Sequence, residues 1–164
     1  MELDRQRSAT LPQAVLLQAH EELQVLTRGE GFQRIDPELN QWIAATGIQV
    51  GVLHLTCLHT SASLTINENA DPRVLEDLAA WMRRVAPQIG VNSLGEREGY
   101  HRYRHDDEGD DDMPAHIRTA LTSQTLSLSV VGGRLQLGIW QAVYLCEWRA
   151  RGSSRRIALH LLGS

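Results

Sequence analysis

The chain has 164 residues, of which 42% are hydrophobic, and this is enough apolar material for one core and too little for two. A formal net charge of -4 gives no general attraction to nucleic acid or to an anionic membrane, so neither is expected as a partner. All sixteen basic residues are Arg. The absence of Lys excludes Schiff-base, pyridoxal-phosphate and P-loop mechanisms that depend on its amine.

The start of the chain carries no recognisable targeting signal. Residues 1–13 are polar and show no periodicity, so we expect a loose N-terminal segment, followed by a single domain over 14–164. No apolar run approaches the roughly 18 residues of a membrane span. Cys57 and Cys146 lie in apolar runs without C-x-x-C spacing, which predicts buried thiols in a reducing compartment. These features predict a cytoplasmic protein.

Strand and helix signals alternate in the first half of the domain. Residues 14–35 contain two apolar runs and predict either a hairpin or one long bulged strand. Asp36 and Pro37 mark the start of a helix that Gly47 should end. Residues 48–69 return to a two-residue period and predict two strands.

The clearest helix signal follows the dipeptide at 71–72, which combines an Asp cap with a Pro, and it ends at Pro87. The loop over 88–112 is long for a compact domain, and such loops are often functional. Asp112 is expected to cap a short helix that continues to residue 121.

Four short strand signals follow residue 125 and predict an antiparallel meander with turns at 132–133 and 151–154. The chain as a whole therefore predicts an α+β fold. We expect a single domain with a mostly antiparallel or mixed, sandwich-like β-sheet and two to three helices.

Two histidines, His105 and His116, bracket six carboxylates and one glycine. Neutral imidazole binds zinc and related ions, but a catalytic metal site usually has a third protein ligand and one open position. The residues between the histidines would then orient the imidazoles. The alternative is an acidic loop that only faces solvent.

His59 is a candidate for the third ligand. Strict alternation places it on the apolar face that carries Leu55 and Cys57, so it is either a ligand at the rim of the sheet or a core-edge histidine with one hydrogen bond. The hydroxyl residues at 60–63 follow directly and are suited to hold an anion. They are equally typical of a turn between strands.

Three motifs together resemble one family. HTSASLTINENADP at 59–72, YRHDDEGDDDMPAHI at 103–117 and GRLQLGIWQAVYLCEWR at 133–149 closely resemble the YjbQ family, whose members have been called secondary thiamine-phosphate synthases. The likeness spans roughly residues 15–163. It implies a small α+β homotrimer with a histidine-lined metal site and a cavity between subunits.

The resemblance also assigns residues. His59, His105 and His116 match recurring histidines and are the implied ligands of a divalent metal, with zinc favoured and magnesium as the alternative. Glu68 and Glu147 are the implied catalytic residues that handle protons. The implied substrate-binding residues are Ser61, Ser63, Asn67, Arg134 and Gln141.

The implied function is a metal-binding protein that acts on a phosphorylated small molecule. Its activity would join hydroxymethylpyrimidine diphosphate to thiazole phosphate as a secondary reaction. Two other hypotheses remain: a zinc-dependent hydrolase, and a non-enzymatic metal- or ligand-binding module. Ile139 and Asp112 depart from the family, which commonly has Thr and often Asn there. Asp112 would add negative charge beside the metal.

Overall fold

The computed structural model describes residues 16–88, 90–92 and 100–164. The predicted loose segment at 1–13 lies outside these residues. Three helices occur in the described part: α1 (Asp36–Thr46), α2 (Pro72–Val85) and α3 (Asp112–Leu121). None of these helices combines the length and apolar content needed to cross a bilayer.

The strands of the described part pair into three sheets, and every pairing is antiparallel. In spatial order, the largest sheet contains β1 (Leu17–Leu26), β10 (Ser154–Gly163), β3 (Val50–Cys57), β7 (Thr125–Val131) and β8 (Arg134–Leu135). The second contains β2 (Gly31–Arg34), β9 (Gln141–Glu147) and β4 (Ala62–Glu68). The third is the pair β5 (Val91–Asn92) and β6 (Tyr100–His101). The predicted α+β fold is confirmed.

β1 and β2 are separate strands in different sheets, so both the predicted hairpin and the predicted single long strand are wrong. β1 pairs with β10, whereas β2 pairs with β9. The chain crosses between the sheets at Gly29 and Gly31, which both have positive φ angles, of 141° and 154°. A Cβ at Gly29 would lie 2.6 Å from the carbonyl oxygen of Ala150, so only glycine fits this crossing.

The predicted meander after residue 125 is also wrong beyond its first turn. β7 and β8 do form a hairpin through Gly132 and Gly133. Their φ angles of 63° and 69° suit a type I′ turn, which requires positive φ at both central residues. β9 then joins the second sheet, and β10 returns to lie between β1 and β3. Strand signals in a sequence locate strands, but long-range packing selects their partners.

The helix ends agree with the sequence at most positions. Gly47 ends α1 in the left-handed conformation, and the Asp71 side chain caps α2 by accepting from Arg73 N at 3.0 Å. Asp36, however, is the first residue of α1 and makes no cap. Its carboxylate instead accepts hydrogen bonds of 2.8 Å from the Arg34 guanidinium.

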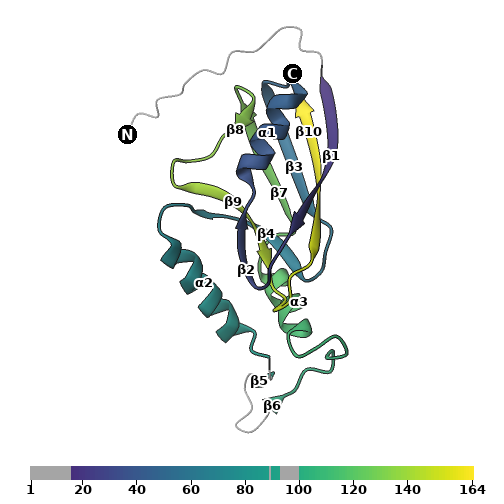
Figure 1. Cartoon of the computed structure of the whole chain (residues 1–164), viewed down its shortest axis with the longest axis vertical. Helices are drawn as coiled ribbons and strands as arrows, with labels where there is room; N and C mark the ends of the chain where they lie inside the picture. The colour runs from purple at the N-terminus through teal and green to yellow at the C-terminus, as the bar shows by residue number, and fades with distance from the viewer. Residues whose placement is uncertain (1–15, 89, 93–99) are drawn as a thin grey trace, which may run out of the picture.

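The main core lies between the two larger sheets and α1 (Figure 1). Its largest fully buried side chains are Ile35, Leu39, Ile43, Ile48, Leu53, Leu55, Leu64, Leu145, Ile157 and Leu161. A smaller cluster lies on the other face of the second sheet and contains Met82, Ala115, Cys146 and Trp148. β9 is therefore buried on both faces, and its alternate side chains serve different clusters.

Leu145 provides a test of this arrangement, because it is fully buried in the central strand of the second sheet. Leu145→Ala is expected to lower the free energy of unfolding by about 2–5 kcal/mol, through lost transfer energy and a residual cavity. Denaturant titration measures this change. Val131→Ala, at an exposed position of β7, is the control and should cost far less. Equal losses in the two variants would contradict the two-faced burial of β9.

Candidate metal centre

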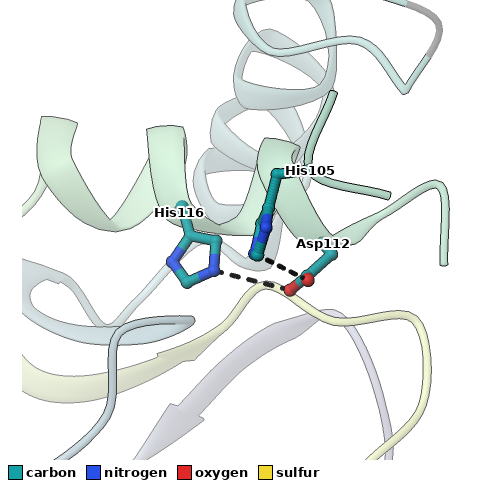
Figure 2. Close-up of side chains that lie close together, drawn as sticks. All are labelled: His105, Asp112 and His116. Carbon is teal, nitrogen blue, oxygen red and sulfur yellow. Dashed lines mark ion pairs between the residues drawn. The ribbon is translucent and has the colours of Figure 1, made fainter. Parts of the chain in front are cut away.

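Three side chains converge where α3 meets the loop that precedes it. Asp112 and His116 are four residues apart on α3 and therefore share one face of the helix. His105 reaches them from the preceding loop, and Figure 2 shows the three side chains pointing toward one another. One ligand atom from each residue lies within 4.8 Å of the others. Among the described residues, no other set of His, Cys, Asp and Glu ligand atoms is gathered this closely.

Asp112 is the centre of this cluster and is only 2% exposed. Its Oδ2 lies 3.0 Å from His105 Nε2, and its Oδ1 lies 3.5 Å from His116 Nε2. Although Oδ2 is fully buried, it accepts no hydrogen bond from any described residue. A buried carboxylate oxygen without a donor is costly, so this atom is suited to bind a cation.

His116 is oriented by the loop between β3 and β4. Its Nδ1 lies 2.9 Å from the carbonyl oxygen of Thr60. Because a carbonyl only accepts, Nδ1 carries a hydrogen, and in the neutral ring the lone pair of Nε2 then faces Asp112. Metal-binding histidines are typically held in this way by their second ring nitrogen.

Arg149 balances the charge of Asp112 from the other side. Its Nη1 donates to Asp112 Oδ1, and its Nη2 donates to the carbonyl oxygen of Glu108 at 2.8 Å. Burial alone would lower the pKa of Arg149, but Asp111, Asp112 and Glu108 together raise it above its ordinary value. The additional negative charge predicted at Asp112 is therefore compensated within the chain.

The predicted cap role of Asp112 is wrong. The N-cap is Asp111, and it makes no side-chain cap hydrogen bond. Asp112 is the first helical residue, and its carboxylate turns toward Arg149 and the two histidines. Its spacing of four residues before His116 was the signal that could have placed it beside that imidazole.

His59 lies outside the cluster. Its Nε2 accepts a hydrogen bond of 2.8 Å from the backbone N of Arg156. Burial, and then the charges of Arg155 and Arg156, lower the pKa of His59, so the ring stays neutral and keeps this acceptor. The arrangement matches the core-edge alternative, and metal binding by His59 stays a prediction.

The residues assigned to substrate and proton transfer divide between two ends of the second sheet. Glu68 pairs in register with Gln141, and Asn67 is next to them at one end of β4 and β9. Glu147 occupies the opposite end of β9, six residues from Gln141, which corresponds to about 20 Å along a strand. One chain therefore does not bring all these residues into one site.

Ser63 and Glu147 are engaged in internal contacts at the histidine end. Ser63 Oγ is fully buried and accepts from Trp148 Nε1 at 2.8 Å and from Thr122 Oγ1 at 2.6 Å. Glu147 forms a buried ion pair with Arg155, with Nε to Oε2 at 2.7 Å. Burial opposes its ionisation, but hydrogen bonds, led by those from Arg155, hold the pKa of Glu147 below its ordinary value. It is therefore a poor proton acceptor near neutral pH.

A pocket of about 490 Å³ lies beside the cluster. Its lining residues are Ser61, Glu108, Asp111, Arg149, Ala150, Arg151, Gly152, Ser153 and Arg155. Ser61 Oγ accepts from Arg155 Nη1 at 3.2 Å, so this predicted residue does face an arginine. Arg134 lines a different recess, with Asp36 and Asn40.

Comparison with known proteins identifies close relatives. A family model described as "UPF0047 protein YjbQ-like" matches residues 21–164. A UPF0047 protein of Synechocystis sp. is 40% identical over 151 residues, which cover 92% of this chain and 96% of that protein. The YjbQ protein of Escherichia coli O157:H7 is 41% identical over 142 residues, covering 86% of this chain and 95% of that protein.

Solved structures share the fold. A YbjQ-like protein of unknown function from Sulfolobus solfataricus P2 has a TM-score of 0.76 at 20% identity, over 92% of this chain and 100% of that chain. A conserved hypothetical protein from Thermus thermophilus has a TM-score of 0.65 at 32% identity, over 84% of this chain and 97% of that chain. None of these four descriptions specifies a reaction, ligand or metal.

The burial of Glu147 leads to a stability prediction. Arg155→Met would leave the Glu147 carboxylate buried without its ionic partner, and the expected loss is about 3–5 kcal/mol of unfolding free energy. Arg156→Met is the matched control: it removes only a surface pair with Glu22 at 3.6 Å, and about 1 kcal/mol or less is expected. Denaturant titrations at neutral pH give both values.

The loss of unfolding free energy in Arg155→Met should depend on pH. Because the folded-state pKa of Glu147 is lowered, its contribution is complete above the unfolded-state pKa and is lost as pH falls through the folded-state value. The gap between Arg155→Met and the native chain should therefore narrow in acid. A gap independent of pH, or equal losses in the two variants, would contradict a buried ion pair.

Proposed function

The chain belongs to the YjbQ-like UPF0047 family, and from this membership we propose that it is a metal-binding protein that acts on a phosphorylated small molecule. The observation that carries the proposal is the convergence of His105, Asp112 and His116 around a buried carboxylate oxygen without a hydrogen bond. The neighbouring pocket supports the choice of an anionic substrate through Arg151, which lines it and is exposed, whereas the other two arginines of the lining, Arg149 and Arg155, are paired with carboxylates.

The donor set favours zinc. Two imidazole nitrogens and one carboxylate oxygen are a common set of three protein ligands for catalytic zinc, which leaves one position open. Magnesium is less suited, because it prefers oxygen ligands. Iron(II) also uses two histidines and one carboxylate, so its content should be measured beside that of zinc. When bound, the metal would supply Lewis-acid stabilisation to an oxygen of the substrate.

The chain's own residues would hold the substrate and the metal in place. Arg149 holds the Asp112 carboxylate in position, and the Thr60 carbonyl orients the His116 ring. Arg151 lines the pocket and is exposed, so its guanidinium is available for bidentate contact with a phosphate. Joining of hydroxymethylpyrimidine diphosphate to thiazole phosphate is proposed as a secondary activity of this site.

Two other functions would use the same cluster differently. A zinc-dependent hydrolase would cleave a phosphorylated substrate without a thiazole acceptor, and a binding module would hold metal or ligand without turnover. The cluster also has a simpler explanation, in which a protonated His105 pairs with Asp112 and no metal binds. Metal content separates this metal-free explanation from the proposed enzyme, the zinc-dependent hydrolase and a metal-binding module.

The first experiment measures metal content and turnover in the same preparations. Protein purified without chelator is expected to hold zinc, and His105→Gln and His116→Gln should each lose both metal and any turnover of the diphosphate and thiazole phosphate. Asp107→Asn, in the same acidic loop but exposed, is the control and should keep both. His59→Gln tests separately whether that histidine contributes.

Native protein with no more zinc or iron than His105→Gln would contradict the metal centre. Full metal occupancy with no turnover of the diphosphate, with or without the thiazole phosphate, would favour the binding module. Release of phosphate without the thiazole compound would favour the hydrolase.

We also propose that the chain assembles as a homotrimer. α2 lies to one side of the sheets in Figure 1, and only Met82 of its apolar face is buried, while Trp81 is 55% exposed. Ile139 and Trp140, in the turn before β9, are 82% and 63% exposed. Large exposed apolar side chains on α2 and in this turn support an interface with another copy.

The oligomer prediction concerns mass in solution. Sedimentation is expected to give three times the 18.4 kDa mass of one chain. Trp140→Glu places a charge in the proposed interface and should shift the mass toward that of one chain, whereas Trp140→Phe should leave it unchanged. A native chain that sediments as a monomer would contradict the proposal.

A further inference from the structure

Three histidines form a row across the largest sheet, away from the cluster on α3. His20 of β1 lies directly opposite His160 of β10, and His160 lies directly opposite His54 of β3. β10 is the middle strand of the three. Adjacent strands are about 4.8 Å apart, so the side chains of the three histidines are neighbours on one face.

This face is the outer one. Leu159 and Leu161, on either side of His160, are buried in the main core, so His160 must point away from it. His20 and His54 are exposed, and His160 is half-buried between them. Solvent and dissolved ions therefore reach all three imidazoles.

The rings already contact one another and polar neighbours. Those of His20 and His160 are stacked, with centroids 4.0 Å apart and an interplanar angle of 25°. His160 Nε2 lies 3.3 Å from Gln18 Oε1, and because that oxygen only accepts, Nε2 carries a hydrogen and, in the neutral ring, Nδ1 has the lone pair. His54 Nδ1 lies 3.0 Å from the Ser127 hydroxyl, in the next strand of the same row. Such contacts orient imidazoles in metal sites.

We propose that His20, His160 and His54 bind a second divalent transition-metal ion, separate from the first centre. Imidazole nitrogen suits copper(II), nickel(II) and zinc, with copper(II) bound most tightly. The row holds no carboxylate ligand, since Glu22, on the same face of β1, pairs instead with Arg156 at 3.6 Å. The remaining coordination positions would be filled by water or by an exchangeable ligand.

Binding requires a side-chain rearrangement. The ligand atoms of the row are not gathered within 4.8 Å, as those of the first cluster are. Metal–nitrogen bonds of about 2.0–2.1 Å require His20 and His54 to lean toward His160 from the flanking strands. Rotation of exposed side chains takes picoseconds to nanoseconds, and the antiparallel backbone already sets the spacing.

The experiment isolates the second site by removing the first. Untagged full-length protein carrying His105→Gln and His116→Gln is titrated with copper(II) by calorimetry, and one equivalent is expected to bind. Adding His160→Gln should weaken copper(II) binding by at least about tenfold, equivalent to 1.4 kcal/mol. This loss should exceed that of His20→Gln or His54→Gln, because His160 lies between the other two histidines. Electron paramagnetic resonance of bound copper(II) should show nitrogen coupling that His160→Gln reduces.

Ser129→Ala, at an exposed position of β7 without an imidazole, is added to the same background as the control and should leave copper(II) binding unchanged. Thermal melts of each variant show that the sheet is intact, and Gln at these positions on the outer face should not unfold it. No binding in the background variant, or unchanged binding after His160→Gln, would overturn the second site. The converse protein, carrying His20→Gln and His160→Gln, tests the first centre by itself, so the two proposals can fail separately.

Discussion

The buried ion pair between Glu147 and Arg155 joins the two larger sheets at the end where the cluster lies. Glu147 is the last residue of β9 and Arg155 is near the start of β10, and both are almost fully buried. The Glu147 carboxylate also accepts a hydrogen bond of 2.7 Å from the Oγ1 of Thr27, the residue just after β1. The Arg155 guanidinium also donates to Ser61 Oγ. One ionic contact thereby holds four segments together, and two of its residues, Ser61 and Arg155, line the pocket.

A second arginine and carboxylate pair extends this network to α3. Arg149, two residues beyond Glu147, contacts Asp111 at 3.3 Å as well as Asp112. Burial would raise the pKa of Asp111, but the backbone N of Ala150 and the charge of Arg149 lower it. The acidic loop is thus divided: Asp111 and Asp112 are structural partners, whereas its more exposed carboxylates face solvent. The solvent-facing explanation therefore describes the exposed carboxylates of the loop, and orientation of the imidazoles of a metal site by the others stays a prediction.

The two histidine groups differ in how the fold creates them. His105 and His116 meet through a helix and the loop before it, beside a buried carboxylate. The row on the largest sheet arises only because β10 returns between β1 and β3. Its members are 34 and 106 residues apart in the sequence, from His20 to His54 and from His54 to His160. No local pattern marks them as neighbours.

Local patterns in the sequence predict the three helices, the turn at Gly132 and Gly133, and the pair His105 and His116. These depend on caps, glycine conformations and short spacings, which act within a few residues. Three features arise only when the chain folds: the partners of β2, β9 and β10, the orientation of Asp112 toward the histidines, and the ion pair of Glu147 with Arg155. The reason is physical: periodicity reports which side of an element is buried, whereas its partners are chosen by packing between distant segments.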